Sequence, residues 1–197
     1  MRAVSQPPPA GDDAATAARA GVVRLRRMTA ADVEQVLRLE QLCFPEEPWD
    51  AAAYVQELRA GRGSLYWVLD AAPSGRPELP PLLGNAGLRL AGRTAHITTI
   101  AIHPDWRRRH LGEWLLLHLL GVARAAGARR VLLEVRAANA AAQALYRKLG
   151  FVRIARLGHY YAGEDGTADV LALNHLDSPG VWRRLRRAQE SVVIDLS

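Results

Sequence analysis

The sequence predicts a single α/β domain built on a mixed β-sheet, and three observations carry that prediction. Residues 94–151 follow the order strand, basic turn, helix, strand, helix. Two apolar strands precede this unit and are joined to it in succession, as antiparallel neighbours are. The chain has 197 residues, of which 49% are hydrophobic, which is enough for one sizeable core and short for two domains.

We expect the folded domain to span residues 21–175. Residues 1–20 contain three consecutive prolines followed by small and acidic residues, which predicts a disordered extension. Residues 176–197 are a predicted C-terminal tail. Its basic segment, residues 182–187, can form a short helix on the core or in contact with RNA; a solvated tail is the alternative.

The N-terminal part of the domain begins with a predicted strand at residues 22–25. Thr29, with Asp32 three residues later, resembles a capping box and predicts a helix that ends near Cys43. A loop with two prolines follows. Asp50 is a candidate N-cap for a second helix of about ten residues.

Four further strands complete the predicted sheet around the central unit. Residues 65–69 and 83–90 form a hairpin whose connection is too proline-rich for regular structure. Residues 152–160 and 169–173 form a last hairpin with an acidic, glycine-containing tip. Within the central unit, the strand of residues 94–102 ends at a His-Pro step, since proline removes a donor from the ladder.

The central unit carries the residues with a chemical signature. The basic turn before its first helix is a predicted phosphate site, because helix N-terminal N–H groups lack intrahelical partners and the helix dipole is positive there. This helix is predicted to end at Gly127. Glu134 is a carboxylate within the next apolar strand. Asn139 is a good N-cap for the second helix, and Tyr146 lies two turns later on the same face, about 10 Å along the axis.

These motifs resemble the core of the GNAT acyltransferases. The family's turn, Gln/Arg-x-x-Gly-x-Gly/Ala, stands here as Arg107-Arg108-Arg109-His110-Leu111-Gly112, with His110 in place of the first glycine. The run from Leu133 to Phe151, which contains Leu-Glu-Val-Arg, is similar to the narrower RimI group of ribosomal-protein Nα-acetyltransferases. The resemblance implies a single GNAT domain, with helices on both faces of the sheet, that uses acetyl-CoA as co-substrate.

The resemblance assigns catalytic roles to two residues. Glu134 is the candidate general base, because a half-buried carboxylate with a raised pKa suits proton abstraction; a salt bridge to Arg136 or Arg130 is the structural alternative. Tyr146 is the candidate acid that protonates the departing thiolate, and packing within the core is its alternative.

The remaining candidate residues bind the two substrates. The predicted acetyl-CoA contacts are Ile100, Ala101 and Ile102 through the main chain, together with Arg107, Arg108, Arg109, His110, Leu111, Gly112, Glu113 and Asn139. The predicted acceptor contacts are Phe44, Trp49, Tyr160 and Tyr161. Phe44 and Trp49 either line a cleft or pack under their loop. Tyr160 and Tyr161, as strand neighbours, point to opposite faces. The acidic residues Glu164, Asp165 and Asp169 either meet a basic peptide or are solvated.

Composition bounds the other partners. The net charge of +6 comes almost wholly from arginine, since Lys148 is the only lysine; composition bias explains it, and a basic surface also suits CoA phosphates or RNA. One cysteine and six scattered histidines predict no disulfide and no metal site. We expect no membrane or DNA partner, a cytoplasmic location, and a monomer or weak dimer.

The expected function is acetyl transfer to the N-terminal α-amine of a protein, and the resemblance points to a ribosomal protein with N-terminal alanine. A small-amine acetyltransferase acting on a polyamine or an aminoglycoside, or a lysine acetyltransferase, is the first alternative. A non-catalytic CoA-binding module on the ribosome is the second, and the joint presence of Glu134 and Tyr146 argues against it.

Overall fold

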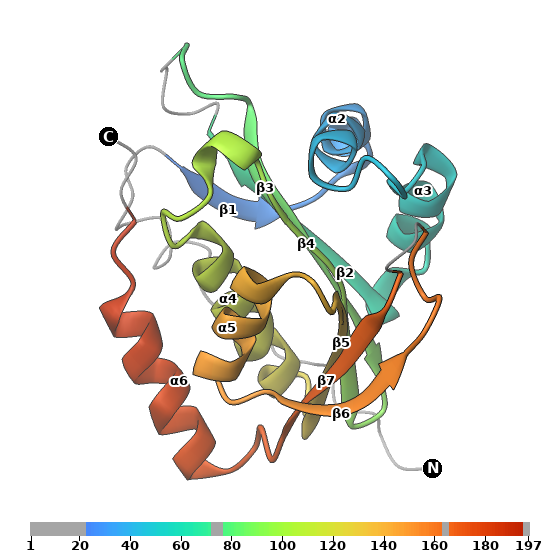
Figure 1. The fold of residues 1–197 in the computed structure, drawn as a ribbon. Coiled ribbons are helices and arrows are strands. Elements are labelled where there is room, and N and C mark those ends of the chain that lie inside the picture. Colours follow the sequence, from blue (N-terminus) through green and yellow to red (C-terminus); the bar gives the residue numbers. More distant parts are fainter. Residues whose placement is uncertain (1–22, 72–76, 163–165, 195–197) are drawn as a thin grey trace, which may run out of the picture.

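The fold is one seven-stranded mixed sheet with helices on both faces (Figure 1), as the sequence predicts. The computed structural model describes residues 23–71, 77–162 and 166–194. The predicted extension at residues 1–20 lies outside these residues, as do Glu164 and Asp165. None of the helices in the described part of the chain is long and apolar enough to cross a membrane.

The strands lie in the order β1-β2-β3-β4-β5-β7-β6. Every neighbouring pair is antiparallel except β4 and β5, which run parallel. The strand bounds are β1 (Arg24–Arg27), β2 (Ser64–Asp70), β3 (Leu82–Ala91), β4 (Thr94–Ile102), β5 (Arg130–Arg136), β6 (Val152–Leu157) and β7 (Ala168–Asn174). The helix bounds are α2 (Val33–Cys43), α3 (Ala51–Arg59), α4 (Leu111–Ala125), α5 (Ala140–Lys148) and α6 (Pro179–Ser191).

The helices divide between the two faces of the sheet. In Figure 1, α4, α5 and α6 lie on one side, and α2 and α3 lie on the other. The larger core cluster joins the apolar side chains of α4, such as Leu116 and Leu120, to the sheet and to Leu185 of α6. A smaller cluster beneath α2 and α3 contains Val36 and Tyr54. The sheet is therefore buried on both faces over its central strands.

Local signals fix most element ends. The Asp32 carboxylate accepts a hydrogen bond from the N–H of Thr29 at 2.8 Å and completes the predicted capping box ahead of α2. Asp50 accepts the N–H of Ala53 at 2.7 Å and starts α3. Gly127, just beyond α4, takes the left-handed conformation with φ 84°, which a glycine adopts without strain.

Two strand predictions need correction. β1 covers Arg24–Arg27 rather than residues 22–25, because its pairing with β2 runs from Arg24 opposite Asp70 to Arg27 opposite Trp67. β6 ends at Leu157 instead of continuing to residue 160, and His159 then takes a left-handed conformation with φ 54° that strands do not contain.

The parallel strands β4 and β5 separate partway along their length. They pair only from Thr94 opposite Arg130 to His96 opposite Leu132. Beyond this point β4 continues to Ile102 and β5 to Arg136 without pairing to each other in the described residues. The sheet therefore opens between the two strands, and the candidate residues gather around this opening.

Candidate active site

The end of β4 presents main-chain groups to the opening between β4 and β5. The N–H of His103 donates to the carbonyl of Leu83 in β3, at 2.9 Å. Main-chain groups alternate between the two sides of a strand. Ile102 and Ile100 therefore direct their N–H groups away from β3 and into the opening, whereas Ala101 directs its own toward β3.

The basic turn before α4 contains two residues with a left-handed backbone conformation. His110 has φ 61° and Arg108 has φ 64°, so both are left-handed. His110 thus holds the conformation for which the family motif uses glycine. Leu111 is 1% exposed and anchors the turn in the core. The Glu113 side chain is buried and turned toward Lys148 instead of toward solvent.

The arginines of this turn are held by local contacts. Arg107 Nε donates to the carbonyl of Ile102 at 3.2 Å, and the Arg109 guanidinium lies 4.6 Å from the centre of the Trp106 ring. A Cβ added to Gly112 would come no closer than 3.6 Å to another residue. The fold itself therefore does not require glycine at position 112, whereas close approach of a phosphate would. The turn therefore remains the predicted site for the pyrophosphate of acetyl-CoA.

Helix α5 carries the other two residues predicted from the central unit. Asn139 caps the helix by accepting the N–H of Ala142 at 3.0 Å. The Tyr146 side chain is 9% exposed, and its ring lies 5.7 Å from that of Phe151. Burial raises the pKa of Tyr146 to about 12, so its phenol stays protonated at neutral pH. Tyr146 therefore packs in the core and also retains the proton that a general acid needs.

Glu134 meets a histidine that the sequence gives no reason to single out. His96 Nε2 lies 2.6 Å from Glu134 Oε2, and both side chains are partly exposed. The predicted partners of Glu134 were arginines, but Arg136 is instead paired with Glu46 at 3.0 Å. The parallel register places His96 opposite Leu132, two residues before Glu134, so both side chains lie on one sheet face. His96 was not among the predicted site residues, and its contact with Glu134 is a finding of the structure.

Two loops meet across Arg136 beside this pair. Arg136 binds Glu46 of the α2–α3 loop and also donates to the carbonyl of Ala162 at 3.2 Å. Its guanidinium lies 4.6 Å from the centre of the Tyr161 ring. The N–H of Ala162 in turn donates to Glu47 at 3.1 Å. The α2–α3 loop and the β6–β7 loop are therefore joined directly by the hydrogen bond between Ala162 and Glu47 and indirectly through Arg136.

The aromatic residues of the α2–α3 loop divide between the two expected roles. Phe44 is 37% exposed. The Trp49 ring packs beneath the loop, with its centroid 5.3 Å from that of Tyr54 and 6.3 Å from that of Tyr66. Trp49 thus supports the loop from below, and Phe44 remains available at its surface.

Tyr160 and Tyr161 do not occupy strand positions, and the prediction that they face opposite sides of a strand was wrong. Both lie beyond the end of β6, and both N–H groups donate to the carbonyl of Gly166, at 2.9 and 2.8 Å. Their rings pack edge to face with centroids 4.9 Å apart. They form one aromatic pair at the β6–β7 loop, in which Tyr160 is the more exposed member.

Asp169 cannot serve as a free acidic contact for a basic peptide. It is 2% exposed and accepts two hydrogen bonds from Arg156, at 2.7 and 3.1 Å. Arg153 lies 3.6 Å away. These arginines lower the pKa of the Asp169 carboxyl, with the Arg156 hydrogen bond as the main cause. The charge of Asp169 is therefore matched within β6 and β7.

A second buried carboxylate, Glu40, was not identified from the sequence. Glu40 is 1% exposed and accepts a hydrogen bond from Tyr54 Oη at 2.6 Å, and Asn85 donates to the same Tyr54 oxygen at 2.8 Å. Thr99 of β4 also donates to Glu40, at 3.4 Å. Burial raises the pKa of Glu40 despite these donors. The available signal was a charged residue on the apolar face of α2, four residues after Val36.

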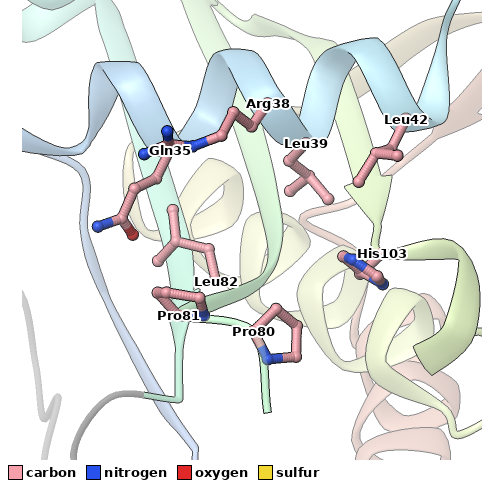
Figure 2. Close-up of a pocket in the computed structure, with 8 residues that line it drawn as sticks. All are labelled: Gln35, Arg38, Leu39, Leu42, Pro80, Pro81, Leu82 and His103. Carbon is pink, nitrogen blue, oxygen red and sulfur yellow. The ribbon is translucent and has the colours of Figure 1, made fainter. Parts of the chain in front are cut away.

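A cavity of about 390 Å³ lies between α2 and the start of β3 (Figure 2). It is lined by Leu39 and Leu42 of α2, by two prolines and Leu82, and by His103 beyond β4. None of the candidate catalytic residues lines it. In the described part of the chain, no group of three His, Cys, Asp or Glu side chains is arranged to hold a metal ion.

Comparison with known proteins identifies the family to which this fold belongs. The chain belongs to the acetyltransferase (GNAT) family, whose sequence model matches residues 33–151. It is an acetyl-CoA-dependent N-acetyltransferase. Membership of this family implies acetyl-CoA as the co-substrate, and the turn before α4 is its predicted binding site.

Several relatives point to one branch of this family. The chain is 32% identical over 152 residues to a putative bS18-alanine N-acetyltransferase of Bacillus subtilis, covering 76% of this chain and 95% of that one. It is 37% identical over 144 residues to the N-alpha-acetyltransferase RimI of Mycobacterium tuberculosis, covering 71% and 84%. The chain spans only 38% of another relative, the uncharacterized protein ML0378 of Mycobacterium leprae, at 36% identity.

A solved structure agrees with this assignment. The ribosomal-protein-S18-alanine N-acetyltransferase of Escherichia coli superimposes with a TM-score of 0.67 and 28% sequence identity. The match covers 78% of this chain and 94% of that one. The chain is therefore related to the RimI-type N-alpha-acetyltransferases.

Proposed function

We propose that this enzyme acetylates the N-terminal α-amine of a protein in the cytoplasm, a small-subunit ribosomal protein that begins with alanine. The observation that carries the proposal is the Glu134–His96 pair, which lies on the sheet beside the two bridged loops. The names of the Bacillus subtilis and Escherichia coli relatives support the ribosomal acceptor.

The acid–base equilibrium of amines favours an N-terminal acceptor. An α-amine has a pKa near 7.7–8.0 and a lysine near 10.4, so about a tenth of the α-amine is neutral at pH 7 against under a thousandth of the lysine. The protonated form of either amine must lose one proton before the nitrogen can attack, and the site offers one carboxylate paired with one histidine for this step. An α-amine therefore matches this site better than a lysine does.

The residues of the site divide the reaction among them. Acetyl-CoA supplies the activated acetyl carbonyl. Glu134, held by His96, accepts the proton that the amine loses as its nitrogen bonds to the carbonyl carbon. In this proposal the N–H group of Ile100 or of Ile102 polarises the carbonyl oxygen. Tyr146 donates a proton to the thiolate when the carbon–sulfur bond breaks.

The bridged loops are the proposed walls of the acceptor groove. Phe44 and Tyr160 are exposed on these loops, and both offer apolar surface to an extended peptide. Arg136 holds the two loops together, and from this contact we infer a narrow groove between them. A narrow groove admits the end of a chain more readily than an internal side chain that carries the backbone on both sides.

The small-amine alternative has less support from the site. A polyamine site needs free acidic groups, and Asp169 is neutralised by arginines from β6. Glu46 and Glu47 are likewise engaged, one by Arg136 and the other by a main-chain N–H. Among the described residues, Asp169, Glu46 and Glu47 are thus all engaged within the protein.

The direct test compares two peptides at equal concentration. One begins with alanine, has a free N-terminus and lacks lysine; the other has a blocked N-terminus and differs in sequence only by a lysine at one internal position. Spermidine is a third acceptor. We expect most of the acetyl mass gain on the free α-amine. Faster modification of the blocked peptide or of spermidine would overturn the proposal and favour the lysine or small-amine alternative.

A second measurement addresses the ribosomal acceptor. Ribosomal proteins from cells with and without this enzyme are compared by mass spectrometry of their N-terminal peptides. We expect one small-subunit protein with N-terminal alanine to lose its acetyl group when the enzyme is absent. A change confined to non-ribosomal proteins would keep the Nα activity and reject the ribosomal part of the proposal.

A further inference from the structure

The buried carboxylate at the start of α4 is neutralised by the only lysine in the chain. Lys148 Nζ, from the last turn of α5, lies 2.6 Å from Glu113 Oε1 and donates to Oε2 at 2.8 Å. His110 Nδ1 lies 3.3 Å from the same Oε2. The Glu113 side chain is 5% exposed, whereas that of Lys148 is 53% exposed. A buried negative charge therefore depends on a cation that solvent reaches.

The position of Glu113 makes its charge relevant to acetyl-CoA. It stands in the first turn of α4, directly after the turn proposed to hold the pyrophosphate. The positive end of the helix dipole stabilises a carboxylate at this position, and it stabilises a bound phosphate in the same way. The two anions therefore share one stabilising field. Without a neighbouring cation, Glu113 would repel the ligand that the turn is built to bind.

We propose that Lys148 sets the affinity for acetyl-CoA by cancelling the charge of Glu113 at the pyrophosphate site. Lys148 is a positioning residue in this account, because it acts through Glu113 and not by touching the reacting atoms. The inference rests on the proposed placement of the pyrophosphate at residues 107–112. It is independent of which amine the enzyme acetylates.

The pair also joins the two helices that contribute to the co-substrate site. Glu113 belongs to α4, with the basic turn, and Lys148 belongs to α5, which carries Asn139 and Tyr146. A purely structural ion pair would stabilise this junction, and removing either partner would weaken it. The electrostatic role instead predicts that the two removals act in opposite directions on acetyl-CoA.

The test measures the dissociation constant of CoA by calorimetry for four proteins. Lys148→Met leaves Glu113 uncompensated and should weaken CoA binding on the order of tenfold at low salt. Glu113→Gln leaves an unpaired cation beside the phosphate and should bind CoA about threefold more tightly than the wild type. The double variant lacks both charges and should return to within about twofold of the wild type.

A matched control separates repulsion from lost stability. Arg89 pairs with Glu57, whose side chain is 13% exposed, at a junction between α3 and β3. Arg89→Met therefore also leaves a largely buried glutamate without its cation, at a pair that belongs to neither α4 nor α5. We expect this variant to lower the melting temperature and to leave the dissociation constant of CoA unchanged.

Chemical modification gives a test that needs no folded variant of Lys148. Lys148 is the only lysine, so treating the folded protein with an acetylating reagent changes one internal amine and the N-terminus. The modified wild type should bind CoA about as weakly as Lys148→Met does. The same treatment of Glu113→Gln should weaken CoA binding by no more than about threefold, because this variant has no buried carboxylate that could be left without a cation.

The outcomes distinguish this inference from the function it rests on. If Lys148→Met and Glu113→Gln both weaken CoA binding equally, the pair is structural and the inference is overturned. If the wild type binds CoA but Arg107→Ala and Arg109→Ala leave binding unchanged, the pyrophosphate lies elsewhere, and the placement at residues 107–112 fails together with the inference. The inference is supported if the dissociation constant of CoA shifts in opposite directions in the two single variants and if these shifts disappear at about 0.5 M salt.

Discussion

The two sides of the opening between β4 and β5 differ in how far apart in the sequence their contributing residues lie. On the side assigned to acetyl-CoA, the β4 end, the basic turn and the start of α4 follow one another within residues 100–113. On the side assigned to the acceptor, Glu134 contacts His96, 38 residues earlier. The α2–α3 loop there meets the β6–β7 loop across 115 residues, through Glu47 and Ala162.

This difference suggests a division of labour that measurements can separate. A contiguous turn presents main-chain groups and arginines, which bind a ligand in its ground state as well as during the reaction. The distant pairs position a carboxylate, whose use is confined to proton transfer. We therefore expect changes at Glu134 and His96 to alter turnover, and changes within residues 100–113 to alter affinity.

The largest effect should come from Glu134→Gln. The amide keeps the size of the side chain but cannot accept the amine proton, so turnover should fall about 10²-fold or more near neutral pH. The dissociation constant of CoA should change little, because Glu134 lies on the acceptor side. Steady-state kinetics and calorimetry on the same protein measure both quantities. Full turnover between about pH 6 and 9 would sink the assignment.

His96→Gln is the companion variant for this carboxylate. It keeps a hydrogen-bonding group near Glu134 but removes the imidazole. If His96 only orients Glu134, turnover should fall less than in Glu134→Gln, and the double variant should be no slower than Glu134→Gln alone. Additive losses would show that His96 acts on the reaction independently.

A smaller loss is expected from Tyr146→Phe, which removes only the phenol oxygen. Turnover should fall by about tenfold or more while peptide binding stays largely intact. Since burial raises the pKa of Tyr146 to about 12, the phenol remains a proton donor up to about that pH, and no basic limb below about pH 10 should arise from it. A variant with full activity and a lower melting temperature would assign Tyr146 to packing on Phe151 alone.

The same difference in sequence distance explains what the sequence could predict. Thr94–Ile102 was predicted with its observed bounds, and the caps at Asp50 and Asn139 were recognised, because hydrophobic periodicity and capping are local. The turn at residues 107–112 was found as a motif for the same reason. The family and the mixed sheet followed from these local signals.

The residues that were missed depend on strand register and loop contacts. His96 becomes a partner of Glu134 only because β4 and β5 pair at His96 and Leu132 before they separate, and no local pattern encodes that register. Tyr160 and Tyr161 were misplaced because β-branched and aromatic residues suggested a longer strand. The turn at His159 and the shared acceptor at Gly166 end it instead.

The smallest expected effect concerns His110, where this chain departs from the family motif on the co-substrate side. His110 has φ 61°, a conformation that costs a side chain with a Cβ about 1 kcal/mol and a glycine almost nothing. His110→Gly should therefore leave the free energy of unfolding unchanged or raise it by up to about 1 kcal/mol, because relief of strain is partly offset by a more flexible unfolded chain. CoA affinity should be unchanged or slightly higher, since glycine allows the closest approach of main chain to phosphate. Gly127→His provides the matched control, because Gly127 has φ 84° and lies beyond the opposite end of α4. A Cβ added there would meet no other residue within 4 Å, so this variant measures the cost of a left-handed histidine without a ligand site. Denaturant unfolding and calorimetry on both variants give the comparison.

A large loss of CoA affinity in His110→Gly, with stability preserved, would mean that the imidazole itself contacts the co-substrate. The turn at this position would then bind through a side chain and not through its backbone.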